Sequence, residues 1–442
     1  MSARTLATEG PFVEPGRERL ESDPSRSPAP DHPPMSAATP AASFRSDATV
    51  ISLVGFAHAT SHFFHFMIPP LFPWLMAEFG LSFTQVGLTM TAFFLVSSIG
   101  QALAGFVVDR FGALRVLVGG ISLLSLSGLV LAGAQNFPML LAAAVVAGIG
   151  NSVFHPADFT LLNRRVSVSR LGHAFSVHGL SGNLGWAAAP VLMIAVAGAW
   201  GWRASGVAAS IVGVAALLFL LANRSLLHDA PLAVAGPKHA KGGTFAFLGV
   251  PVVWMCFVFF FFTVMAFGVL QNFAVPVFEQ GYGVTLGFAA SGLTAYLLGS
   301  AAGTGTGGFF ATQGDRQERK VAVALAVAAL CAVLLATGKA PDWGIVVLMA
   351  VMGFGAGFSG PSRDMLVRRA ATSTFGDAAY GRIAGFVYSG IDLGLAGAPL
   401  VFGPMMDAGQ FVQVLWGVAV LQTLAIATAL TVGARSRRTG SG

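Results

Sequence analysis

Long apolar runs separated by short polar segments make up most of the sequence. Twelve such runs follow residue 46, and each is long enough, at about 1.5 Å per residue, to cross roughly 30 Å of hydrocarbon as a helix. The pattern predicts an all-α membrane protein with twelve transmembrane helices. Their approximate bounds are 50–75, 85–108, 116–135, 139–162, 172–197, 203–222, 245–278, 286–311, 321–338, 343–366, 383–403 and 411–433.

Composition supports a membrane protein. Hydrophobic residues make up 55% of the chain and charged residues only 10%, against about 25% charged residues in soluble domains. These values exclude a soluble enzyme, a nucleic-acid-binding protein and a secreted scaffold. The net charge of +6 does not indicate nucleic acid, because the basic residues lie in short loops between apolar runs rather than in one patch. Cys256 and Cys331 both stand in apolar runs, so no disulfide framework is expected.

The distribution of basic residues predicts the orientation in the membrane. Residues 1–46 are rich in proline and polar residues, which predicts a disordered tail. If that tail is cytoplasmic, 23 of the 25 lysines and arginines fall on the cytoplasmic side, as the positive-inside rule requires. Both termini are therefore expected in the cytoplasm, with the chain in a bacterial inner membrane.

An internal repeat divides the apolar runs into two halves. The Gly148-Ile-Gly150 motif and Pro156 recur 205 residues later as Gly353-Phe-Gly355 and Pro361. We therefore expect an N-terminal six-helix bundle over 47–222, a cytoplasmic linker over 223–243, a C-terminal six-helix bundle over 244–433 and a basic tail over 434–442. Parallel halves of this kind place a binding site between them, near the bilayer midplane.

The loop between the second and third runs carries a family signature. The segment from Gly105 to Arg115 resembles the Gly-x-x-x-Asp-Arg-x-Gly loop of the major facilitator superfamily, which implies the twelve-helix fold and transport by alternating access. It also implies a cytoplasmic gate built from this loop. The internal repeat extends the gate, because Asp109-Arg110 returns as Asp315-Arg316 and Arg363 stands at the repeat-equivalent position of Asp158. The gate residues are Gly105, Asp109, Arg110, Gly112, Arg115, Asp315, Arg316 and Arg363.

Several further motifs are similar to the fosmidomycin-resistance type of efflux protein within that superfamily. They are His58-x-x-x-His62, Pro69-Pro70, Leu81-Ser82, Gln85-Val86-Gly87, Gln101 and Phe154-His155-Pro156. That branch usually has an acid where His62 stands. The span-four motif of drug/proton antiporters is incomplete, because Ala144 replaces its arginine. The resemblance therefore supports secondary transport more strongly than efflux.

Ionisable residues inside the apolar runs are candidate site residues, because a charge in hydrocarbon costs several kcal/mol. His58, His62 and His65 have i, i+4, i+7 spacing and are expected on one helix face. They can carry protons or bind an organic anion; the alternative is three histidines hydrogen-bonded to backbone carbonyls. A metal site is disfavoured, because no carboxylate or thiolate is near them in sequence.

His155 and Asp158 flank Pro156, and we expect Asp158 to orient His155. Asp158 has two alternative partners, a nearby arginine pair or Arg363 across an inner gate. Asp392 stands near the middle of its run and replaces Asn183 of the first half. A carboxylate there either exchanges a proton during transport or packs helices together as a neutral acid. The remaining candidates for contact with substrate are His178, Gln271 and Asn272.

Together these residues favour a transporter that moves a small molecule with proton coupling, as an efflux antiporter and a monomer without cofactor or bound metal. Proton-coupled uptake of a small organic acid is the main alternative, and a non-transporting membrane sensor or scaffold is a third. An integral-membrane enzyme is not expected, because no nucleophile–base pair or metal motif in the sequence supports one. The glycine-rich segment 303–308 matches a nucleotide motif only formally; in an apolar run its small residues favour close helix packing.

Overall fold

A computed structural model describes residues 44–227, 246–311, 316–375 and 380–440. Two compact units divide the chain, 1–41 and 42–442, and all described residues belong to the second. The described part contains helices and no strands. The helices are α1 (Phe44–His65), η1 (Pro69–Leu71), α2 (Phe72–Phe79), α3 (Phe83–Phe111), α4 (Ala113–Ala132), α5 (Phe137–Asn151), α6 (Phe154–Arg165), η2 (Val168–Arg170), α7 (Leu171–Trp200), α8 (Trp202–Ala222), α9 (Arg224–Leu227), η3 (Ala246–Gly249), α10 (Pro251–Tyr282), α11 (Leu286–Ala311), α12 (Gln317–Ala336), α13 (Asp342–Phe375), α14 (Tyr380–Asp407) and α15 (Phe411–Gly440).

The all-α membrane fold is confirmed. Among the described residues, eleven helical segments are long and apolar enough to span a bilayer, with α5 and α6 together forming one of them. The first predicted run, 50–75, is not among the eleven. Its helix α1 ends at His65, and the apolar residues that follow form a turn, η1 and α2, because Pro69 and Pro70 supply no N–H groups for a continuous helix. The count of twelve spans stays a prediction.

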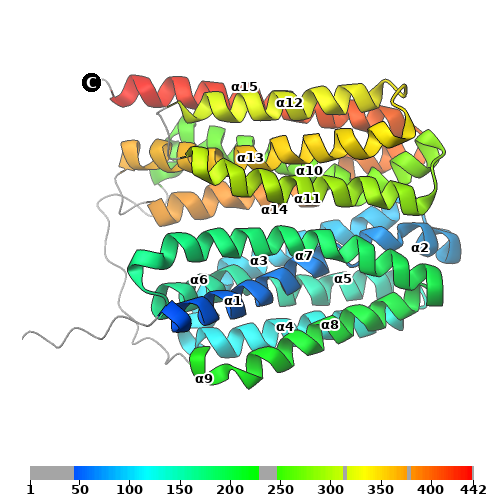
Figure 1. Ribbon diagram of the computed structural model, residues 1–442, viewed down its shortest axis with the longest axis horizontal. Coiled ribbons are helices and arrows are strands. Elements are labelled where there is room, and N and C mark those ends of the chain that lie inside the picture. The colour runs from blue at the N-terminus through cyan, green and yellow to red at the C-terminus, as the bar shows by residue number, and fades with distance from the viewer. Residues whose placement is uncertain (1–43, 228–245, 312–315, 376–379, 441–442) are drawn as a thin grey trace, which may run out of the picture. The chain divides into compact units, whose positions relative to one another are not determined.

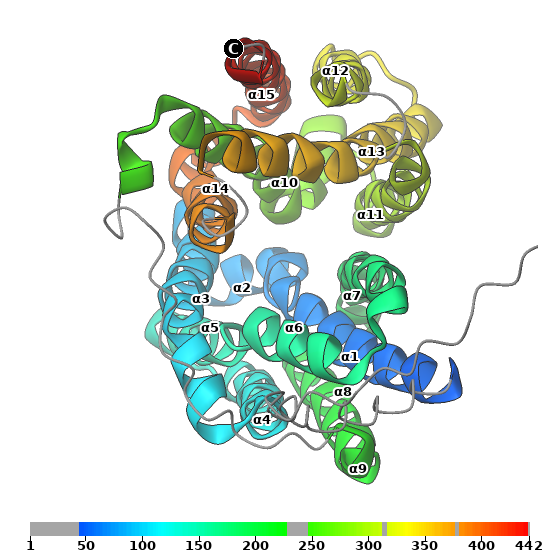
Figure 2. The same cartoon turned by 90° about the vertical axis from the view of Figure 1, so that its left-hand side faces the viewer.

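The helices gather in two groups (Figures 1 and 2). Helices α1 to α9 form one group and α10 to α15 the other, and the start of α1 and the end of α15 lie at the same end of the bundle. Close packing of α11 on α13 uses glycine: a Cβ on Gly303 would lie 2.2 Å from the carbonyl oxygen of Phe354. The expectation of helix packing at segment 303–308 is therefore confirmed.

Parts of the predicted domain scheme lie outside the described residues, including most of the tail 1–46 and of the linker 223–243. Helix α1 begins at Phe44, and α15 continues through the predicted tail as far as Gly440. The exact domain boundaries remain predictions.

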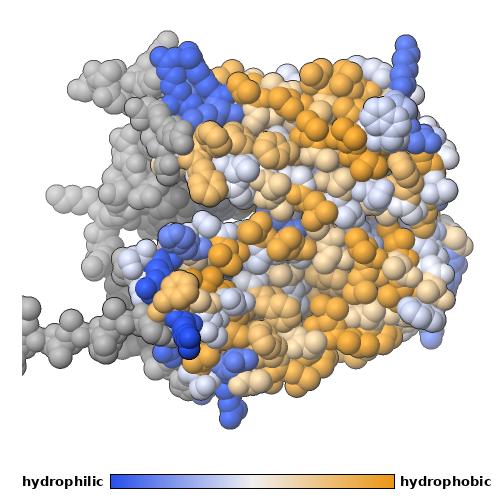
Figure 3. Space-filling model, viewed as in Figure 1, coloured by the Kyte–Doolittle hydropathy of each residue, from blue (hydrophilic) through white to orange (hydrophobic). Residues whose placement is uncertain are grey.

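Apolar side chains cover most of the described surface on the face that Figure 3 shows. Hydrophilic residues gather toward the two ends of the bundle, and many large apolar side chains are exposed between them. Examples are Phe309, at 76% exposure, and Ile211, at 63%. A surface of this kind is stable in hydrocarbon and not in water, so the protein is a multi-pass membrane protein.

An ion pair near the start of α1 gives a prediction about pH. The carboxylate of Asp47 accepts a hydrogen bond from Arg170 Nη1 at 2.6 Å, outside the predicted spans. Burial opposes ionisation, but hydrogen bonds from Ser167 and Arg170 outweigh it and hold the pKa of Asp47 below its ordinary value of 3.8. A lowered pKa means that the carboxylate stabilises the fold above pH 3.8 and that this contribution is lost as the pH falls through the lowered value.

We expect Asp47→Asn to lower the free energy of unfolding by about 1 kcal/mol at pH 7. Thermal unfolding of the detergent-solubilised protein, followed by circular dichroism, measures the difference. The gap between wild type and variant should shrink as the pH falls below 3.8. A gap that is equal at pH 7 and pH 3 would contradict the role of the ionised carboxylate.

Candidate functional site

Five buried or half-buried histidines form one cluster between α1, α6 and α7. The rings of His58 and His178 stack with centroids 3.5 Å apart, and His62 and His65 stack at 4.7 Å. The ring of His155 lies 5.4 Å from that of His58. The predicted shared face of the three α1 histidines is therefore present, and two further helices contribute to the same cluster.

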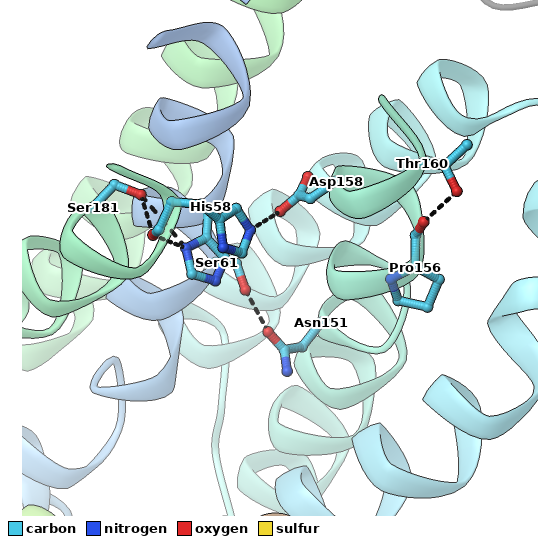
Figure 4. Close-up of polar contacts among 8 residues, drawn as sticks. His58, Ser61, Asn151, Pro156, Asp158, Thr160 and Ser181 are labelled. Carbon is cyan, nitrogen blue, oxygen red and sulfur yellow. Dashed lines mark hydrogen bonds and ion pairs between the residues drawn. The ribbon is translucent and has the colours of Figure 1, made fainter. Parts of the chain in front are cut away.

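His58, His178 and Asp158 form a hydrogen-bonded chain (Figure 4). The Nδ1–H of His58 donates to the backbone carbonyl of His178 at 2.8 Å. The Nε2 atom of His178 lies 3.0 Å from Oδ2 of Asp158, whose side chain is fully buried. The expectation that Asp158 orients His155 is wrong: α6 begins at Phe154, and Asp158 faces α7, where it contacts His178.

His65 has a different role from its neighbours. The indole N–H of Trp186 donates to Nδ1 of His65 at 3.2 Å, so the ring proton is on Nε2, which donates to Oδ1 of Asn151 at 2.9 Å. The amide of Asn151 also accepts from Ser61 Oγ and donates to Ser97 Oγ. Both ring nitrogens of His65 are therefore used in a structural network, and a proton-carrying role for this residue is not supported by its contacts.

Gly182 on α7 allows the cluster to form. A Cβ at this position would lie 2.6 Å from Nδ1 of His62 and 2.8 Å from Cε1 of His58. These separations are shorter than side chains tolerate, so only glycine permits both rings to approach α7 this closely.

We expect Gly182→Ala to displace the His58 and His62 rings and to reduce any activity that depends on the cluster by about tenfold or more, since a displacement of 1 Å in a binding site has effects of this size or larger. Activity of the protein in membrane vesicles, normalised to the amount of protein, is the measurement. Gly179→Ala is the matched control, because a Cβ at Gly179 meets no atom within 4 Å. Equal losses in the two variants would show that α7 tolerates no alanine, independently of the cluster.

The predicted polar residues of α7 and α10 are all buried. Asn183 is buried on α7 beside Gly182. Gln271 donates from Nε2 to the backbone carbonyl of His65 at 2.8 Å, which connects α10 with α1. Asn272 donates to the Gly268 carbonyl of its own helix. These two amide groups already donate a hydrogen bond. Their side-chain oxygens are buried and have no hydrogen-bond partner in the part of the chain that the structure describes.

Asp392 lies where the two groups of helices meet. Its carboxyl group is close to the hydroxyl of Ser98 on α3. Along the same α3–α14 contact, Thr91 Oγ1 donates to the carbonyl of Ala396 at 2.8 Å, and a Cβ on Gly87 would lie 2.7 Å from the Pro399 side chain. Asp392 is thus at an interface that any relative motion of the groups must change.

The same contact ends in a carboxylate that binds the start of a helix. Asp407, at the end of α14, accepts hydrogen bonds from the N–H groups of Phe83 and Thr84 at 2.5 and 3.1 Å, and from Thr84 Oγ1 at 2.6 Å. These are the first residues of α3, whose N-terminus favours negative charge. We call this set of contacts the Asp407 latch. It holds the two groups together at one end of α3.

At the other end of α3 the packing is much looser. In the last turns of the helix only Ala104 and Val108 are buried, whereas Leu103 and Phe106 are exposed by 58% and 77%. The first turns of α3 are instead buried on two sides, with Phe83, Val86 and Met90 in the core. The two helix groups are therefore in contact at the latch, whereas few side chains pack on α3 near Arg110. We call the end of the bundle at which Arg110 lies the cationic end.

The predicted gate residues lie at this cationic end, where the structure describes them. Gly112 has φ +86°, a conformation that favours glycine, and it connects α3 to α4. Gly105, Asp109, Arg110 and Arg115 are exposed. Arg316 is exposed at the start of α12, and Asp315 lies outside the described residues.

An ion pair between Asp158 and Arg363 is not present in this structure. Arg363 Nε lies 3.1 Å from Oδ1 of its neighbour Asp364, and its guanidinium stacks 4.5 Å above the ring of Phe260. Asp158 contacts His178. Asp158 and Arg363 thus each contact a residue of their own helix group.

A multi-pass helical protein in two helix groups, with a polar cluster in its interior, has the architecture expected of a membrane transporter. The family model of the Major Facilitator Superfamily matches residues 54–399, so this chain belongs to that superfamily. The resemblance found in the sequence motifs is confirmed.

Sequence identity to individual relatives is low. The chain is 27% identical to the "Fosmidomycin resistance protein" of Escherichia coli K12 over 300 residues, 66% of this chain and 71% of that protein. It is 34% identical to the "Multidrug resistance protein B homolog" of Mycobacterium tuberculosis H37Rv over 143 residues, 32% of this chain and 26% of that longer protein. A solved bacterial homologue of the human lysosomal transporter Spinster, inward-facing and occupied, shares the fold with a TM-score of 0.68 at 14% identity, covering 90% of this chain and 98% of that one.

Proposed function

We propose that this transporter exports a small molecule by alternating access and is driven by an inward proton gradient. The observation that carries the proposal is the placement of the histidine cluster. Buried polar side chains in hydrocarbon are costly unless they face partners or water. Several polar atoms of this cluster have no hydrogen-bond partner among the described residues. The helix groups are in contact at the latch, and α3 is largely exposed at the cationic end. That combination suits a binding site reached from one side of the membrane.

Binding and coupling are assigned to different residues. His58, His62, His155 and His178 contact the substrate, with His65 and Asn183 shaping the site. Asp392 carries the coupled proton, because a carboxylate at the interface between the helix groups changes its surroundings when they move apart. Asp109 and its loop stabilise one conformation at the cationic end.

The surroundings of the cluster favour an amphipathic or weakly anionic substrate. The Trp186 ring stacks on His62 at 4.4 Å and lies 4.8 Å from Phe267, which in turn stacks on Tyr296 at 6.1 Å. Aromatic walls bind apolar portions of a ligand, and imidazoles bind an anionic or hydrogen-bonding group. The two resistance proteins matched above, by their names, are consistent with export.

The orientation follows from charge. We assign the cationic end, both termini and the linker to the cytoplasm of a bacterial cell, with the chain in the inner membrane as a monomer. On this assignment the loosely covered end of α3 faces the cytoplasm, which is the side from which an exporter takes its substrate.

Transport by inverted vesicles tests the proposal. A panel of weakly anionic antimicrobial compounds is first screened for growth resistance in a strain that expresses the protein. A compound that scores is then offered to inverted vesicles, and we expect accumulation that depends on a proton gradient acidic inside and is abolished by a protonophore. Accumulation in right-side-out cells instead would favour proton-coupled uptake of an organic acid. No flux of any compound in either preparation would favour a sensor or scaffold.

A further inference from the structure

Three ring nitrogens of the histidine cluster are buried and unused. They are Nε2 of His58, Nδ1 of His62 and Nδ1 of His155, and none has a hydrogen-bond partner among the described residues. A buried polar atom without a partner costs about 1–3 kcal/mol, so three in one place require an explanation. Protonation of all three rings does not explain these unpaired nitrogens, because three like charges would then lie close together in a site with little water.

The unused nitrogens belong to residues that converge. One nitrogen from each of His58, His62 and His155 lies within 4.8 Å of the other two. The ring centroids of His58 and His62 are 4.2 Å apart, and those of His62 and His155 are 6.4 Å apart. Nitrogens around tetrahedral Zn²⁺ lie about 3.4 Å from one another, a spacing that these rings reach by small side-chain rotations.

A hydrogen bond fixes His58 in the tautomer that a metal ligand needs. Its Nδ1–H donates to the backbone carbonyl of His178 at 2.8 Å, which leaves the lone pair on Nε2. Metal-binding histidines usually have this arrangement, in which the second ring nitrogen donates to a carbonyl or carboxylate and fixes the tautomer. His65, with both nitrogens occupied by Trp186 and Asn151, is excluded as a ligand by the same reasoning.

The carboxylate of Asp158 lies beside the cluster, although Asp158 is far from the α1 histidines in the sequence. Atoms of His58, Asp158 and His178 also lie within 4.8 Å of one another, and Oδ1 of Asp158 is buried without a partner among the described residues. When ionised, this carboxylate compensates part of the charge of a bound cation. The absence of an acid beside the α1 histidines in the sequence is therefore no argument against a metal.

We propose that His58, His62 and His155 bind one divalent transition-metal ion, of the Zn²⁺, Co²⁺ and Ni²⁺ class, with Asp158 and His178 next to it. Imidazole ligands suit these ions rather than Mg²⁺ or Ca²⁺, which prefer oxygen. Three protein ligands leave a fourth coordination position for water or for an oxygen or nitrogen atom of a transported compound. The site lies within one helix group, so an ion bound there does not require the groups to close.

Cobalt spectroscopy tests the proposal on the purified, tag-free protein in detergent. Titration with Co²⁺ alone should give ligand-field absorption of tetrahedral type that saturates at one ion per chain and is abolished by Zn²⁺. In His62→Gln and in His155→Gln the absorption should be lost and Zn²⁺ affinity, measured by calorimetry, should fall at least about tenfold. His173→Gln, at an exposed position of α7, should bind as wild type does.

Two results would overturn the proposal: no tetrahedral absorption from wild-type protein, or binding that His62→Gln and His155→Gln leave unchanged. Thermal unfolding of each variant without metal identifies one that fails to fold, and the two variants remove ligands from different helices. Metal binding to the purified chain is measured without transport, so its outcome is independent of the direction and coupling of flux.

Discussion

Asp392→Asn is expected to reduce proton-driven accumulation in inverted vesicles to the background of vesicles that lack the protein. Asparagine preserves the size of the side chain and its ability to contact Ser98, but an amide does not exchange a proton in the physiological range. The variant should therefore also lose the dependence of transport on external pH. The measurement is the initial rate of accumulation at a series of pH values.

The matched control for this prediction is Asp342→Asn. Asp342 is exposed at the start of α13, away from the α3–α14 contact, and its replacement should leave both the rate and the pH profile unchanged. Gradient-driven accumulation that persists in Asp392→Asn would remove Asp392 from the coupling step and leave the histidines as the remaining candidates.

Opening of the Asp407 latch is the second large expected effect. Asp407→Asn removes the negative charge that three hydrogen-bond donors of α3 now share. Hydrogen bonds to a charged group contribute about 1.5–3 kcal/mol, so we expect the ratio of latched to unlatched molecules to fall roughly tenfold or more. Spin labels at Ala77 and Ala408, both exposed near the latch, report the change as a longer distance distribution in Asp407→Asn.

This latch experiment has a clear negative result. If the distance distributions of the labelled wild type and Asp407→Asn coincide, the Asp407 contacts do not hold the two helix groups together. Asp342→Asn, labelled at the same positions, controls for the loss of an acid elsewhere at the surface.

The fold could be predicted from the sequence because the bilayer imposes a simple rule. Every backbone group in hydrocarbon must be hydrogen-bonded within a helix, so apolar runs of sufficient length reveal the spans directly. The rule is weakest where a helix carries polar residues, as α1 does, and where prolines interrupt it, as at Pro69 and Pro70. That first segment is the one for which the expected continuous span and the structure differ.

The site could be predicted only in part. Periodicity brings the α1 histidines together, since i, i+4 and i+7 positions share a helix face. Periodicity does not show which helix packs against that face. The sequence therefore predicts His155 as the neighbour of Asp158, whereas the structure has His178 there. Asn151 and Trp186 are not among the predicted site residues. Asn151 is a polar residue within an apolar run, and that is a sequence signal by which it can be recognised.

Residues whose role depends on contact between the two halves were beyond sequence reasoning. Asp407 follows the predicted span 383–403 and resembles an ordinary residue of a connecting loop. Only its position beside the first N–H groups of α3 shows that it closes one end of the interface. Gly182 depends on packing within one helix group instead, because the two histidine rings that require a glycine there come from α1, whereas Gly182 is on α7.

Water access to the histidine cluster from the cationic end tests the central claim most directly. In a chain carrying His155→Cys, with Cys256 and Cys331 replaced by alanine, a membrane-impermeant cationic thiol reagent is added to inverted vesicles and to intact cells. We expect fast labelling in inverted vesicles and slow labelling in cells, and slow labelling in both for Leu218→Cys, an exposed position of α8. Labelling of His155→Cys as slow as that of Leu218→Cys, or faster in cells than in inverted vesicles, would contradict the account.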